Sequence, residues 1–127
     1  MPTKEIFRTE WKTFFDDFTR YHQGWMARVQ IFSQELGAQE EIQEMPFVAI
    51  IAEMKAGSKD CLEVIFGKTP ESHISHTIVE PTRIQLESEA MTEVLQIESA
   101  SAGTFLLSFH HATSLEKANY GALEKSN

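Results

Sequence analysis

The sequence predicts an α+β fold in which an N-terminal amphipathic helix packs on a strongly curved, mostly antiparallel meander sheet of about seven strands. Large aromatic side chains recur at helical spacing near the N-terminus, whereas later segments alternate apolar and polar residues with period two. Short turns separate those segments, so sequence neighbours should also be sheet neighbours. A twisted sheet of this length curls, and we expect the curl to approach a partly open barrel.

The chain has 127 residues, a length that suits one hydrophobic core and is short for two. We expect residues 1–111 to form a single α+β domain. Residues 112–127 are small, polar and weakly periodic, and they predict a loosely ordered C-terminal tail.

The helix is expected at about residues 10–23. Its apolar face comprises Trp11, Phe14, Phe15, Phe18 and His22. Thr9 precedes the helix as a potential cap, and Gly24 supplies the left-handed residue that ends many helices. Rings at this spacing are usually core, because each contributes roughly 1.5 to 3 kcal/mol on full burial. The helix should therefore cover one face of the sheet.

The first strands are expected directly after the helix, beginning at Trp25. Residues 38–44 carry polar side chains on both faces, which favours an edge strand or an exposed ribbon. Pro46 then breaks or bulges the chain. Residues 47–55 are apolar on both faces, and we expect a central strand there.

The remaining strands are short stretches, most of them alternating, that are separated by turn residues. They are expected at residues 61–67, 73–79, 83–89, 94–99 and 104–110. The last two are joined by Ala100-Ser101-Ala102-Gly103 and predict a hairpin. Polar side chains opposite the apolar face predict a wet sheet face, made of Glu63, Gln85, Glu87, Gln96 and Glu98.

The net charge of the chain and the length of its apolar runs limit the kinds of partner that we expect. A formal charge of −8 repels phosphate backbones, so we expect no nucleic acid partner. The longest apolar run, residues 47–52, is far shorter than a membrane-spanning helix, so we expect no membrane partner. Cys61 is the single cysteine, and the start of the chain lacks a secretory pattern, so the expected location is cytoplasmic.

The histidines are the best candidates for chemistry. His73 and His76 lie three residues apart on a predicted strand and face opposite ways, which disfavours a shared metal. His76 shares its face with apolar residues, so it is either a core histidine or a polar group lining a cavity. If a pocket exists, His76 and Arg83 are its expected ligand-binding residues. We expect no metal and no cofactor.

Catalytic motifs are absent from the sequence. It contains no Gly-rich phosphate loop, no Gly-x-Ser-x-Gly elbow and no His-Glu-x-x-His pair. Cys61 follows Asp60 and precedes Glu63, and these carboxylates disfavour the thiolate that a nucleophile needs. No catalytic residue is assigned, which leans against an enzyme.

Four dispersed blocks of the sequence are distinctive when taken together. They are Glu10-Trp11 through Phe15-Asp16-Asp17-Phe18, His22-Gln23-Gly24-Trp25, Leu36-Gly37-Ala38-Gln39, and His76-Thr77-Ile78 leading to Pro81-Thr82-Arg83. These blocks resemble a family of small uncharacterised bacterial proteins, DUF5335. The resemblance covers about residues 4–110. It implies a bacterial, cytoplasmic domain and brings no catalytic residue with it.

Two functions follow as hypotheses. The first is a non-enzymatic binding or accessory module that contacts a protein partner, or a second copy in a homodimer, through a sheet face or the edge at residues 38–44. The alternative is a small-ligand carrier or weak enzyme that uses a pocket in the curled sheet near His76 and Arg83.

Overall fold

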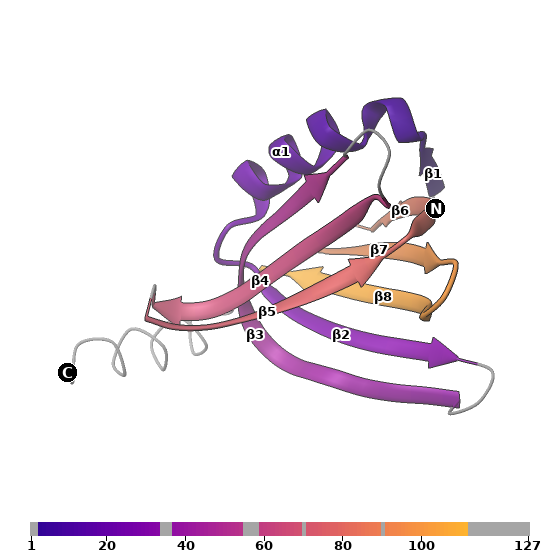
Figure 1. The fold of residues 1–127 in the computed structure, drawn as a ribbon. Coiled ribbons are helices and arrows are strands. Elements are labelled where there is room, and N and C mark those ends of the chain that lie inside the picture. The colour runs from indigo at the N-terminus through magenta and orange to yellow at the C-terminus, as the bar shows by residue number, and fades with distance from the viewer. Residues whose placement is uncertain (1–2, 34–36, 55–58, 70, 90, 112–127) are drawn as a thin grey trace, which may run out of the picture.

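The fold of the chain is described by a computed structural model (Figure 1), which covers residues 3–33, 37–54, 59–69, 71–89 and 91–111. The predicted tail at residues 112–127 lies outside them. The described residues form eight strands, a short 3-10 turn and one helix. They are β1 (Thr3–Ile6), η1 (Arg8–Glu10), α1 (Trp11–His22), β2 (Met26–Ser33), β3 (Gly37–Glu53), β4 (Cys61–Thr69), β5 (Ser72–Val79), β6 (Pro81–Ser88), β7 (Thr92–Ser99) and β8 (Gly103–His110).

The strands form an antiparallel sheet in the order β1-β6-β7-β8-β2-β3-β4-β5. Hairpins join β2 through β5 and β6 through β8, as the meander prediction requires, and β8 pairs with β2 to unite the two groups. The expected count of about seven strands was too low. The described residues hold eight strands, or nine if the two halves of β3 are counted separately.

Strand β3 is long because it serves two partners in succession. Its first half, up to Pro46, pairs with β2, and from Phe47 onward its opposite side pairs with β4. The change of partner coincides with register shifts on both sides and with a positive φ of 32° at Glu44. Pro46 therefore marks a bend and a change of partner within one continuous strand.

The sheet curls on itself without closing. Strands β1 and β5 are the two ends of the strand order, so hydrogen bonding does not complete a barrel. Figure 1 shows β4 and β5 passing in front of β7 and β8, and ring contacts across the interior join these layers. His76 on β5 meets Phe105 on β8 with centroids 5.4 Å apart, and Phe47 on β3 meets Phe109 at 5.0 Å.

The interior of the curl is filled by apolar side chains from every layer. The sheet supplies most of the core, including Ile50, Leu62, Val64, Phe66, Ile84, Leu95, Ile97 and Leu107, each at most 1% exposed. The helix adds Trp11, Phe15 and Phe18, which are at most 4% exposed. This confirms the prediction that the aromatic face of the helix covers the inner face of the sheet.

The start of α1 differs in detail from the prediction. Thr9 lies inside η1 and does not cap the helix, and the Phe7 N–H instead donates to the Glu10 carboxylate at 3.3 Å. The indole N–H of Trp11 donates to the carbonyl of Ile6 at 2.8 Å, which fixes the helix start against β1. Gly24 has the expected positive φ, at 86°.

The helix also covers a backbone edge of β3. The Thr19 hydroxyl accepts from the Ile50 N–H at 2.9 Å and lies 3.2 Å from the Ile50 carbonyl, to which it donates. After the helix, the Gly24 N–H donates to Phe47 O at 2.9 Å and the Phe47 N–H donates to Trp25 O at 2.8 Å. Helix and linker thus supply the partners that a neighbouring strand would otherwise provide.

The prediction that residues 47–55 form a central strand was wrong in two respects. This half of β3 pairs with β4 on one side, and on the other side it meets α1 instead of a strand. Its inner face is buried at Phe47 and Ile50, but Ile51 on the outer face is 45% exposed. Apolar residues on both faces therefore did not mean burial on both faces.

Replacing Thr19 with valine tests the edge contact. The Thr19→Val variant keeps the side-chain shape but leaves the N–H and carbonyl of Ile50 without their hydroxyl partner, and we expect a loss of about 1 to 3 kcal/mol in unfolding free energy. Chemical denaturation measures this loss. The control is Thr13→Val on the exposed part of the same helix, which should change stability by less than about 0.5 kcal/mol. Equal effects at the two positions would contradict the edge role.

Candidate functional site

His76 lies on the inner side of β5. It pairs in register with buried Val64 of β4, is partly exposed, and packs edge-on against the ring of Phe105. His73 pairs with Gly67 and lies on the opposite face. The two histidines thus diverge, as their spacing predicts. The described residues contain no cluster of three or more His, Cys, Asp or Glu side chains able to hold a metal ion.

Arg83 lies on the outer side of the sheet, next to buried Ile84 on β6. Its guanidinium forms ion pairs with Glu5 of β1 at 3.4 Å and with Glu98 of β7 at 3.9 Å. These contacts link three neighbouring strands across the predicted wet face. The contacts of Arg83 and of His76 lie on different faces of the sheet and do not join the two residues.

His22, at the end of α1, is a buried histidine for which the sequence predicted no polar role. Its Nδ1 lies 2.9 Å from the carbonyl of Phe18, and its Nε2 lies 2.8 Å from the carboxylate of Glu93. The ring stacks on Phe18 with centroids 3.8 Å apart. Both nitrogens are engaged, so the pair holds the helix end to β7 and leaves no ring nitrogen for a substrate. Nothing local in the sequence signals a pairing across 71 positions.

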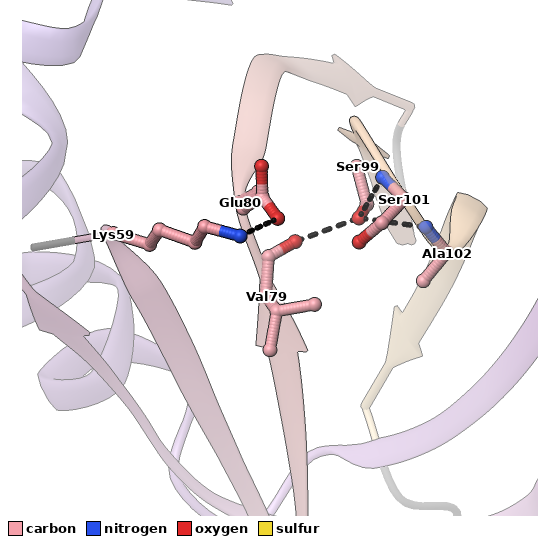
Figure 2. Close-up of polar contacts among 6 residues, drawn as sticks. All are labelled: Lys59, Val79, Glu80, Ser99, Ser101 and Ala102. Atoms are coloured by element: carbon pink, nitrogen blue, oxygen red, sulfur yellow. Dashed lines mark hydrogen bonds and ion pairs between the residues drawn. The ribbon is translucent and has the colours of Figure 1, made fainter.

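A network of polar contacts lies at the corner where β5 turns into β6 (Figure 2). Glu80 is the single residue between the two strands and has a positive φ of 48°. Its N–H donates to Asp60 O at 3.0 Å, and its carbonyl accepts from the Ala100 N–H at 2.9 Å. Lys59 forms an ion pair with its carboxylate at 2.9 Å. The corner therefore joins the segment before β4 to the turn after β7.

Ser99 completes this corner. Its hydroxyl donates to the carbonyl of Val79 at 2.6 Å and accepts from the N–H groups of Ser101 and Ala102. Gly103 ends the turn with a φ of 93°, where a Cβ atom would lie 2.3 Å from the carbonyl oxygen of Phe32. A glycine is required there for both reasons. The Ser99 hydroxyl is thus engaged with three backbone groups, which limits its use in catalysis.

A polar hollow lies beside the same turn, with a volume of about 780 Å³. Its lining includes Phe32, Thr82, Glu98, Ser101 and Thr104. Arg83, one of the two predicted ligand-binding residues, forms an ion pair with the lining residue Glu98. We call it the turn hollow.

A second hollow is apolar and lies on the outer face of β3 and β4, with a volume of about 420 Å³. Its lining includes Val48 and Ile65 together with Lys68 and His73. Ala49 pairs with Ile65, and Ile51 follows on the same face of β3. We call Val48, Ala49, Ile51 and Ile65 the outer patch. It is an apolar surface that is only half covered.

An exposed ion pair ties the N-terminal segment to the corner. Arg8 donates to both carboxylate oxygens of Asp60, at 2.8 and 3.1 Å. These hydrogen bonds, opposed in part by desolvation and assisted by the charge of Arg8, lower the pKa of Asp60 from its ordinary value. The carbonyl of Asp60 also accepts from Glu80, so side chain and backbone act on the same junction.

Comparison with known proteins identifies the family. The model of a family of unknown function, DUF5335, matches residues 2–118. The chain belongs to this family. No curated protein and no solved structure matched the chain. Within the described residues of this DUF5335 member, no helix is long and apolar enough to cross a membrane.

The Arg8 and Asp60 pair predicts a pH dependence of stability. Because the pKa of Asp60 is lower in the folded chain, its carboxylate stabilises the fold above the unfolded value of about 3.9 and loses that effect as pH falls through the folded value. The Asp60→Asn variant should therefore be less stable than the parent at neutral pH, with a difference that vanishes in acid. Denaturation midpoints between about pH 2 and about pH 7 measure it.

The control for this measurement is Asp16→Asn, at an exposed position of α1. A difference between Asp60→Asn and the parent that persists unchanged into acid would show that the amide acts through packing and not through charge.

Proposed function

We propose that this DUF5335 protein is a non-enzymatic binding module that holds a protein partner through its outer patch. The observation that carries the proposal is Ile51, which is 45% exposed beside an apolar hollow lined by Val48 and Ile65. Contiguous apolar surface of this kind is typical of interaction sites, whereas isolated exposed apolar residues are ordinary.

The position of the patch supports the proposal. The inner face of the same strands is buried in the core, and α1 covers the edge of β3 at Ile50, so this segment is rigidly held. A rigid surface loses little conformational entropy on binding. The hollow accepts an apolar anchor from a partner, and anchors buried in such pockets dominate the energetics of many interfaces.

The engagement of the polar residues supports a non-enzymatic role. His22 uses both ring nitrogens, Ser99 serves three backbone groups, and Arg83 pairs with two carboxylates. A general base or nucleophile needs a reactive atom directed at a substrate. These side chains instead hold strands and turns together.

Quantitative capture tests the proposal. Full-length protein carrying Ile51→Lys should bind its main partner from the native host at least about tenfold more weakly than the parent, because a charged side chain would enter an apolar contact. The matched control is Ile74→Lys, which replaces an isoleucine 49% exposed on β5. It should capture the same partner as the parent does.

Photo-cross-linking gives an independent readout of the same contact. A photo-reactive residue at position 51 should form one dominant adduct with that partner, and one at position 21, where Tyr21 is 73% exposed on α1, should not. Equal capture by parent and Ile51→Lys, or equal adducts from both positions, would overturn the proposal.

A second candidate function is the binding of a small polar ligand at the turn hollow. Its support is the ion pair of Arg83 with Glu98, a residue that lines this hollow. His76 would contribute only through its contact with Phe105, the neighbour of the lining residue Thr104. Thermal-shift screening separates the two candidates, because a ligand of the hollow raises the melting temperature of the parent and not of Arg83→Ala.

A further inference from the structure

Strand β5 is the last strand of the sheet, and within the described strands it pairs with β4 alone. It is eight residues long, and most of its first six residues are exposed. Such an edge presents a row of backbone donors and acceptors on its outer side. An edge of this kind is a template for pairing with another strand.

The other described edges have features that hinder pairing with a further strand, and β5 lacks these features. Strand β1 has only four residues and carries Lys4 and Glu5. The second half of β3 is covered by α1 through Thr19, and its first half contains register shifts and the positive φ of Glu44. The sequence of β5, Ser-His-Ile-Ser-His-Thr-Ile-Val, contains no acidic residue, lysine, arginine, proline or glycine. Proteins commonly use those residues to block edge pairing.

The charge of the chain indicates what pairs with this edge. Two copies, each with a formal charge of −8, repel one another over most of their surfaces. Strand β5 carries no carboxylate, so two copies approach there at the lowest electrostatic cost. Ile74 is 49% exposed on this strand and gains burial if a second strand is added.

We propose that two copies of the chain pair through antiparallel β5 strands about a two-fold axis at Ser75, which makes one continuous sheet across the dimer. In an antiparallel pair, side chains that lie directly opposite one another are on the same face of the sheet. For two identical strands related by a two-fold axis, this requires the axis to pass through a residue and not between two residues. A pairing centred at Ser75 leaves Val79 outside the paired segment. The carbonyl of Val79 already accepts a hydrogen bond from the Ser99 hydroxyl. Ile74 of each copy then lies opposite His76 of the other, an aliphatic and aromatic cross-strand pair.

This assembly goes beyond the proposed partner site and does not depend on it. The outer patch lies on β3 and β4, and the pairing uses the edge of β5. Ile51→Lys and Ile74→Lys are therefore reciprocal controls, since each changes one exposed isoleucine to lysine and alters the net charge equally. The failure of one proposal can be recognised while the other holds.

Mass measurement over a concentration series is the first test. The full chain should show twice the mass of one copy at high concentration, and Ile74→Lys should weaken dimerisation at least about tenfold. Ile51→Lys should dimerise like the parent. A chain that stays monomeric throughout, or a dimer that Ile51→Lys breaks and Ile74→Lys does not, would overturn the proposal.

Disulfide cross-linking tests the register and does not rely on the stability of Ile74→Lys. In a Cys61→Ser background, Ser75→Cys should form a disulfide between copies under mild oxidation, because directly opposed residues have suitable spacing. Thr77→Cys, two residues away on the same exposed strand, should not, because its counterpart would lie roughly 13 Å distant. Cross-linking at position 77 that matches that at position 75 would overturn this pairing.

Discussion

The backbone edge of the second half of β3, which α1 covers in place of a strand, is the constraint on which the rest of the fold depends. Because β3 changes partner at Pro46, no described strand pairs with one side of its second half. The Thr19 hydroxyl supplies the missing hydrogen bonds to Ile50, and the aromatic face of the same helix enters the core. Edge protection and core burial are thus achieved by one element, which explains why so aromatic a helix stands beside this strand.

This arrangement leaves the outside of the molecule for function. The interior is filled by apolar side chains, and the polar corner at Glu80 holds the turn between β5 and β6 in a conformation that costs energy for a residue other than glycine. Accessible surfaces among the described residues include the outer patch, the turn hollow and the edge of β5. The two proposals concern different parts of this surface and are tested separately.

Much of the fold could be predicted from periodicity. The helix at residues 10–23, the alternating strands and the final hairpin all rest on local patterns, and they agree with α1 and with the observed strands. The contacts between distant segments could not be predicted in the same way. Alternation does not tell which strand pairs with β8, nor that Pro46 divides the partners of β3.

The candidate site was harder to predict than the fold. The sequence correctly separated His73 from His76, because opposite faces follow from strand geometry. The sequence did not predict the ion pairs of Arg83, because Glu5 and Glu98 come from other strands. It also did not predict the contact between His22 and Glu93. The outer patch was hidden for a different reason. Apolar residues on both faces of a strand fit a buried strand and an interaction surface equally well.

Amide hydrogen exchange measured on dilute protein determines whether the helix protects the edge of β3 while the edge of β5 stays open. We expect slow exchange at the Ile50 N–H, which donates to Thr19, and rapid exchange at alternate amides along β5. Rapid exchange at Ile50, or uniformly slow exchange along β5 at concentrations where the chain is monomeric, would contradict this expectation.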